Sequence, residues 1–181
     1  MSKIIAVVGM AGAGKSVISK ALQDMGFPVI RFGDATHRYL KEKNLPENEK
    51  NERTAREELR KKHGMAAYAI LNKPYLDKAL EKGGVVIDGL YSWEEYTWMK
   101  QQYGEDIVVL AVYVSPKTRT ERLKTREVRP LTPEERESRD ESEIENLNKG
   151  GPIAIADYTI INEGPVSKLK AEVQAFAQQY L

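Results

Sequence analysis

The stretch Gly9-Met10-Ala11-Gly12-Ala13-Gly14-Lys15-Ser16 constrains the fold of this chain more than any other. It follows the pattern G-x-x-x-x-G-K-S of the Walker A phosphate-binding loop. Glycines let such a loop curl with its N–H groups pointing inward, and the helix that follows presents its positive end to an anion. We expect Lys15 to reach the β- and γ-phosphates of ATP and the Ser16 hydroxyl to bind Mg²⁺. The predicted nucleotide-binding residues are Gly9, Gly12, Ala13, Gly14, Lys15, Ser16 and Val17.

The segments on either side of this loop have the patterns that the motif requires. Residues 4–8 are a short, β-branched apolar run, which is typical of a buried parallel strand. Residues 17–25 place apolar side chains at helical spacing. The order is therefore strand, loop, helix. The alternative, an ordinary turn with a surface lysine, explains the glycines but not this order.

Composition excludes several other classes of protein. The 181 residues predict a single domain, and 28 basic against 27 acidic side chains create no net field that would attract nucleic acid or a membrane. There is no cysteine, which excludes disulfides and thiolate metal sites. The apolar run near the N-terminus is too short for a signal peptide, and no segment approaches membrane-spanning length. We expect a cytoplasmic monomer or homodimer.

A second predicted strand, residues 27–32, ends in Gly33-Asp34. Ligands of open α/β sheets bind at the carboxyl ends of the strands, so Asp34 is a candidate to orient or deprotonate an acceptor. Arg38 follows on the predicted helix and is a candidate to bind the acceptor. We interpret residues 34–63 as an acceptor-binding arm.

Arginines recur within the charged segment 44–63. Arg53, Arg56 and Arg60 share one face of a predicted helix. Two interpretations remain open: a solvated helix face with ion pairs, or a stripe in which Arg56 and Arg60 bind an acceptor phosphate.

A third apolar strand, residues 85–89, ends in Asp88-Gly89, the arrangement of a Walker B acid. Asp88 is expected to hold Mg²⁺ with Ser16 and to lie close to the substrate. The alternative role is to cap the next helix, which the aromatic pattern of residues 92–103 predicts.

Arginines also follow the fourth predicted strand, residues 107–114. Ser115-Pro116 starts a helix on which Arg119, Arg122 and Arg126 share a face. We interpret residues 126–145 as a lid, with Arg122 and Arg126 supplying charge to the transferring phosphoryl group. A solvated charged helix is the alternative. A fifth strand within residues 156–164 and a closing helix, residues 165–181, complete a predicted five-stranded parallel sheet with helices on both faces.

With these motifs in place, the chain resembles the P-loop kinases of small metabolites. It is similar to nucleoside monophosphate kinases of the adenylate type and to dephospho-coenzyme A kinases, and it looks closest to poorly characterised archaeal-type proteins related to adenylate kinase. Gly33-Asp34 resembles the Gly-Asp after the second strand of adenylate kinases. Asp88-Gly89 resembles the Asp-Gly of monophosphate kinases, whose motif continues with an arginine that holds the acceptor phosphate, whereas this chain has Leu90-Tyr91-Ser92. The turn at Asn162 looks like the one that lies near adenine in dephospho-coenzyme A kinases.

The resemblance implies transfer of the γ-phosphoryl group of ATP to a small acceptor, a nucleoside monophosphate or dephospho-coenzyme A, with Mg²⁺ present. Asn162 would then join the nucleotide site. Two other functions remain open: a switch that hydrolyses nucleotide to control a partner, and a regulatory protein that binds nucleotide without catalysis. The lack of a residue that orients an attacking water favours the kinase.

Overall fold

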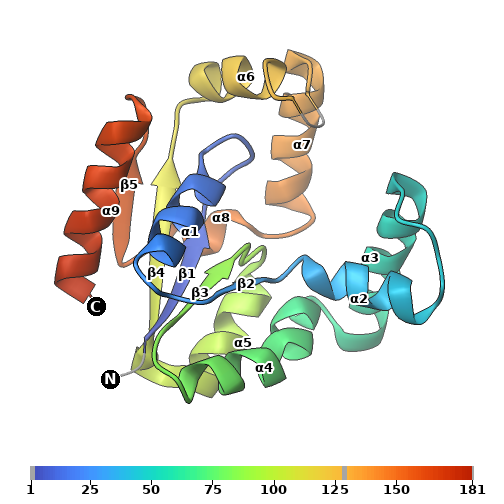
Figure 1. The fold of residues 1–181 in the computed structure, drawn as a ribbon. Helices are drawn as coiled ribbons and strands as arrows, with labels where there is room; N and C mark the ends of the chain where they lie inside the picture. The colour runs from blue at the N-terminus through green and yellow to red at the C-terminus, as the bar shows by residue number, and fades with distance from the viewer. Residues whose placement is uncertain (1–2, 128–129, 181) are drawn as a thin grey trace.

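A computed structural model describes residues 3–127 and 130–180 and contains one parallel five-stranded sheet (Figure 1). The strand order is β2-β3-β1-β4-β5, so the strand that precedes the glycine-rich loop is central. The register pairs Val7 with Asp88 on one side and with Leu110 on the other. The predicted α/β fold class is confirmed. The strands are β1 (Ile4–Val8), β2 (Val29–Arg31), β3 (Val85–Asp88), β4 (Ile107–Tyr113) and β5 (Tyr158–Ile161).

The core has two layers because successive strand residues point to opposite faces of the sheet. Ile4, Ala6 and Val8 of β1 pack in one layer, and Ile5 and Val7 pack in the other. Helices α1 (Lys15–Asp24) and α9 (Val166–Tyr180) cover the second face. The first face is covered by α4 (Ala67–Leu80), α5 (Trp93–Tyr103) and the short α8 (Gly150–Ala154), with a 3₁₀ turn, Gly104–Asp106, after α5.

Two helices extend to one side of the sheet, α2 (Asp34–Glu42) and α3 (Glu49–His63) (Figure 1). They fall within the segment interpreted as an acceptor-binding arm. Asn48 caps α3 by accepting a hydrogen bond from the N–H of Asn51. Only Glu52, Ala55 and Leu59 of α3 are buried, which is why this segment is rich in charge and poor in apolar residues.

At the loop end of the sheet lie α6 (Pro116–Lys124) and α7 (Pro133–Glu145), above the turn that joins β1 to α1 (Figure 1). Ser115 caps α6, and a capping box of Thr132 and Glu135 starts α7. The predicted lid, residues 126–145, includes residues 128–129, which lie outside the described residues, as do residues 1–2 and 181 of the predicted domain. No helix within residues 3–127 and 130–180 has the length and apolar character to cross a membrane.

Candidate functional site

Three glycines of the loop adopt backbone conformations that side chains rarely take. Gly9, Gly12 and Gly14 have φ angles of +148°, +79° and +100°. A side chain at two of these positions would collide with other parts of the protein. A Cβ at Gly9 would come within 2.6 Å of the carbonyl oxygen of Val112, and one at Gly14 within 2.6 Å of Nδ2 of Asn162. The strand ends therefore enclose the loop.

The loop leaves backbone donors unused. In the part of the chain that the structure describes, no acceptor pairs with the N–H groups of Gly12, Gly14, Lys15 or Ser16. These groups belong to the loop and the first turn of α1, where the helix dipole favours an anion. Lys15 Nζ donates to the carbonyl oxygens of Gly9 (2.9 Å) and Met10 (3.1 Å), so the lysine folds back over its own loop. The loop and Lys15 therefore have the donors that a phosphate chain requires.

The charge state of Lys15 reflects its surroundings. Burial and, to a smaller extent, the ammonium of Lys149 lower the pKa of Lys15 to about 7. The carboxylates of Glu143 and Asp88 act in the opposite direction. A phosphate beside Lys15 would add negative charge and favour the charged ammonium.

Ser16, Asp34 and Asp88 line one cavity of about 250 Å³, although they come from three separate segments. Ser16 belongs to the first turn of α1, Asp34 begins α2, and Asp88 ends β3. The sequence predicts that these three side chains share a site, and in the structure they line one cavity. Its lining residues are Ser16, Ser19, Lys20, Gln23, Val29, Arg31, Asp34 and Asp88.

Asp88 does not cap the following helix, because Ser92 does so by accepting a hydrogen bond from the N–H of Glu95. Burial raises the pKa of Asp88, while the charges of Lys15 and Arg31 lower it. The hydroxyl of Ser16 and the carboxylates of Asp88 and Asp34 are oxygen ligands of the kind that Mg²⁺ prefers. Among the described residues, no group of three acidic or histidine side chains forms a complete metal site. A magnesium ion here would take its other ligands from phosphate and water.

Arg38 lies beside Asp34 but is held by α4. The two residues line a second cavity, of about 480 Å³, together with His37, Lys41, Leu45 and Glu47. Arg38 Nη2 donates to Oδ1 of Asn72 at 2.7 Å, and its guanidinium lies 4.4 Å from the centre of the Tyr75 ring. These contacts fix the guanidinium at the edge of the second cavity.

Arg56 and Arg60 have partners within the protein. Arg56 donates to Glu49 at 2.9 Å and to Glu52 at 3.4 Å. The guanidinium of Arg60 lies 5.2 Å from the centre of the Tyr68 ring, and its Nε is buried without a hydrogen bond among the described residues. Neither arginine lines the cavity that holds Asp34 and Asp88.

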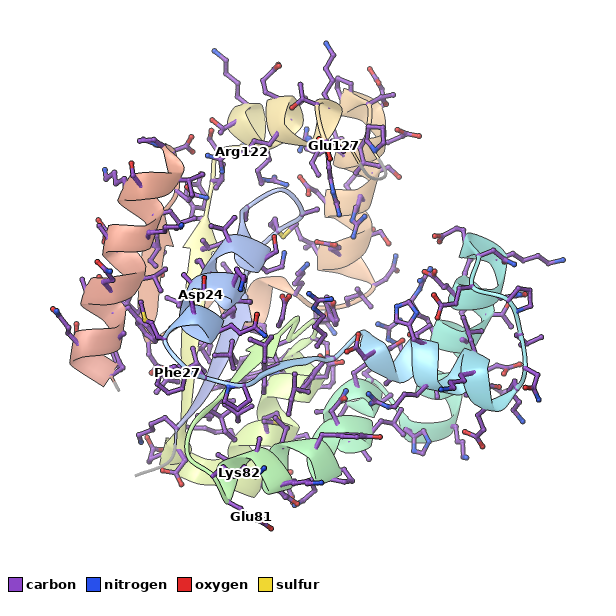
Figure 2. The ribbon with its side chains drawn as sticks, in the orientation of Figure 1. Asp24, Phe27, Glu81, Lys82, Arg122 and Glu127 are labelled. Carbon is purple, nitrogen blue, oxygen red and sulfur yellow. The ribbon has the colours of Figure 1, made fainter. Side chains whose placement is uncertain are left out.

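The prediction that Arg126 shares a helix face with Arg119 and Arg122 is wrong, because α6 ends at Lys124 and Arg126 lies beyond it. Arg122, labelled in Figure 2, donates from Nη2 to the carbonyl oxygen of Asn162 at 2.9 Å. Arg126 is exposed. Asn162 is buried and donates from Nδ2 to the carbonyl oxygen of Ala13 at 2.8 Å, so it holds the loop. Arg122 and Asn162 therefore act together at the turn after β5.

Sequence reasoning did not assign a site role to Arg119, which is buried against the loop. Its Nη1 donates to the carbonyl oxygen of Ala11 at 3.2 Å, and both terminal nitrogens bind Asp140 of α7. It also missed Glu143 and Lys149, a buried ion pair near Lys15. The local sequence signals were the i, i+4 spacings of Arg136 with Asp140 and of Arg139 with Glu143, which pair in the structure. These spacings did not identify Arg119 or Lys149 as further partners.

The central β1, the glycine-rich loop and the acid at the end of β3 define a P-loop NTPase domain. A model of the AAA domain matches residues 5–146. The chain belongs to this P-loop family and, within it, to the UPF0200 proteins. A UPF0200 protein of Pyrococcus abyssi is 33% identical over 182 residues, covering 98% of this chain and 97% of the relative. Another, from Pyrococcus furiosus, is 35% identical over 175 residues, covering 94% of each chain.

Solved structures of small-molecule kinases have the same fold. A shikimate kinase from Bacteroides thetaiotaomicron superposes with a TM-score of 0.62 at 15% identity, covering 98% of this chain and 99% of that one. A dephospho-CoA kinase from Campylobacter jejuni superposes with a TM-score of 0.59 at 17% identity, covering 98% and 97%. The predicted resemblance to P-loop kinases is confirmed at the level of the fold.

Proposed function

We propose that this protein transfers the γ-phosphoryl group of ATP to a small acceptor. The observation that carries the proposal is the single cavity lined by Ser16, Asp34 and Asp88 at the end of the phosphate-binding loop. A donor phosphate on the loop and an acceptor beside Asp34 would meet there. Phosphoryl transfer requires mainly positioning and charge stabilisation, which such a cavity can supply.

Each residue of the site has a role in this proposal. The unused N–H groups of the loop and Lys15 bind the phosphates of ATP. Ser16 and Asp88 would hold Mg²⁺, which would supply positive charge to the phosphates. Asp34 orients the acceptor or takes its proton. Arg122, fixed by Asn162, acts on the nucleotide side, together with Arg126 when the lid closes.

The acceptor is proposed to be a nucleotide, either a nucleoside monophosphate or dephospho-coenzyme A. Arg38 supports an anionic acceptor because it lines the second cavity together with Asp34. Arg56 and Arg60 lie on the arm and would bind the acceptor only by exchanging their present partners for a phosphate. Arg38 is therefore the first arginine to test.

The experiment is a panel of acceptors incubated with ATP and Mg²⁺, with product measured directly and ADP release measured in parallel. We expect ADP release to depend on one acceptor. Lys15→Met should abolish nucleotide binding, whereas Asp34→Asn should retain it and lose at least a hundredfold in acceptor-dependent turnover. Asp106→Asn, an exposed acid far along the sequence from the loop, is the control. Hydrolysis of ATP at the same rate without any acceptor would overturn the proposal.

A further inference from the structure

A second buried lysine lies near the phosphate-binding loop. Lys149, between α7 and α8, is 2% exposed, and its Nζ donates to Oε2 of Glu143 at 2.7 Å. The same Nζ lies 5.6 Å from the centre of the Tyr91 ring, which follows β3. Glu143 lies three residues after Asp140 on α7, and Arg119 joins Asp140 to the carbonyl oxygen of Ala11 in the loop. The charge of Lys149 also acts on Lys15. The buried ammonium of Lys149 therefore lies close to the part of α7 that is attached to the loop.

Positive charge exceeds negative charge around this pair. Glu143 is buried, which by itself would raise its pKa, but Lys149, Arg139 and Lys15 hold that pKa below its usual value. Glu143 is therefore a carboxylate shared among three cations.

The number of cations around Glu143 is larger than a structural ion pair requires. A buried pair balances one charge against one, whereas here two ammoniums lie near one another with a surplus of cation. Burial lowers the pKa of Lys149, and Glu143 only partly opposes that effect. An anion bound between the two lysines would remove the unfavourable interaction. Because an ammonium has three N–H donors and Glu143 is its one hydrogen-bond acceptor among the described residues, Lys149 has donors left for that anion.

We propose that Lys149 binds the terminal phosphate of the nucleotide together with Lys15, and that Glu143 is the residue that positions it. This inference rests on the proposed nucleotide site, but it does not require that a phosphoryl group be transferred. The ring of Tyr91 covers the ammonium from the side of β3 and limits its contact with water. Lys149 would thereby distinguish a triphosphate from a diphosphate.

The test compares the binding of Mg²⁺–ADP with that of a Mg²⁺–ATP analogue that has a β,γ-imido bridge, by calorimetry. For Lys149→Met we expect Kd for the analogue to rise about tenfold or more, as for loss of a charge-assisted hydrogen bond, and Kd for ADP to stay within about twofold. Lys124→Met, an exposed lysine on α6, is the matched control and should change neither Kd. Equal changes in both Kd values for Lys149→Met, or no change in either, would overturn the inference.

Removing one partner of a buried ion pair can prevent folding, so a second variant is needed. Replacing both partners by apolar residues of similar volume is tolerated far better. The double variant Lys149→Met with Glu143→Met should therefore fold and show the same selective loss of analogue binding. If the double variant still prefers the analogue as the wild type does, Lys149 does not contact the terminal phosphate. If the selective loss occurs but no acceptor is ever phosphorylated, the proposed transfer fails and the inference about Lys149 stands.

Discussion

Arg119 of α6 and Asp140 of α7 face each other in two parallel hydrogen bonds of 2.7 and 2.6 Å. Arg119 also binds the carbonyl oxygen of Ala11, so one guanidinium joins the phosphate-binding loop to the predicted lid. Burial would raise the pKa of Asp140, but Arg119 and Arg136 hold it below its usual value. The lid helix is thus attached to the loop by an ionised, buried carboxylate.

We predict that Asp140→Asn destabilises the protein by about 3 kcal/mol, because it removes the carboxylate that the buried guanidiniums of Arg119 and Arg136 share and leaves Arg136 only Glu137, 4.0 Å away. The measurement is the free energy of unfolding from urea titrations. The control is Glu57→Gln, which breaks the exposed pair of Arg53 and Glu57, whose side chains are 76% and 66% exposed. That change should cost less than about 1 kcal/mol. Equal costs for the two variants would refute a structural role for the Arg119–Asp140 pair.

The contacts of Asn162 lead to a prediction about the affinity for nucleotide rather than about the stability of the fold. Its side chain binds the carbonyl oxygen of Ala13, and its own carbonyl oxygen accepts from Arg122. We predict that Asn162→Ala raises Kd for Mg²⁺–ADP about fivefold, the equivalent of one hydrogen bond of about 1 kcal/mol. Asn146→Ala, at the exposed end of α7, should leave Kd unchanged. An unaltered Kd for Asn162→Ala would remove Asn162 from the nucleotide site.

The local parts of the site were predictable from the sequence, and the long-range parts were not. The glycine-rich loop, Lys15 and Ser16 lie within eight consecutive residues whose pattern carries its own physical reason. Asp88 ends β3 and Asp34 begins α2 shortly after β2, and parallel strands bring their carboxyl ends to one edge of the sheet. Their presence in one cavity follows from that rule.

The arginine face of α6 illustrates what helical spacing cannot predict. Spacing placed Arg119, Arg122 and Arg126 together, but α6 ends before Arg126. The partners of Arg119 lie in the loop and on α7, and the partner of Arg122 lies in the turn after β5. Arg119 is buried, Arg122 is half-buried and Arg126 is exposed. The carboxylate partner of Lys149 is only six residues away, at Glu143, but the Tyr91 ring beside its ammonium follows β3. Such contacts come from packing between segments that are distant in the sequence.

Glu95 provides the pH-dependent prediction. Its Oε2 accepts a hydrogen bond from the N–H of Tyr91 at 2.7 Å, while Oε1 is buried without a partner among the described residues. Burial raises the pKa of Glu95 from 4.5 to about 8, against the lowering effects of that hydrogen bond and of Arg60. Between pH 4.5 and 8 the folded protein therefore keeps a proton that the unfolded chain releases.

The contribution of Glu95 to the free energy of unfolding is consequently highest below pH 4.5 and falls as the pH rises toward 8. The slope is at most about 1.4 kcal/mol per pH unit, the value for one proton. We predict that Glu95→Gln, which is neutral at every pH, removes this fall, so the difference in stability between variant and wild type grows in favour of the variant from pH 5 to pH 8. Glu105→Gln, whose side chain is 93% exposed, is the control. Parallel stability curves for wild type and Glu95→Gln would contradict the prediction.

Gly89 and Gly26 form a matched pair for testing how Tyr91 closes the end of β3, because both have a φ angle of +98°. A Cβ at Gly26 would meet nothing within 4 Å, so Gly26→Ala should cost only the backbone strain of about 1–2 kcal/mol. A Cβ at Gly89 would lie 2.5 Å from Cζ of Tyr91. Gly89→Ala must therefore also displace that ring, and we predict that it costs at least about 1 kcal/mol more than Gly26→Ala.

A double-mutant cycle separates the two contributions at Gly89. In the Tyr91→Ala background the ring is absent, so Gly89→Ala should cost no more than Gly26→Ala does in the wild type. The measurement is the free energy of unfolding of all four members of the cycle. The cycle also bears on Lys149, because the Tyr91 ring covers its ammonium. If Gly89→Ala lowered the free energy of unfolding equally with and without the Tyr91 ring, the ring would not be packed over β3. The ring would then no longer be expected to shield the ammonium of Lys149 from water.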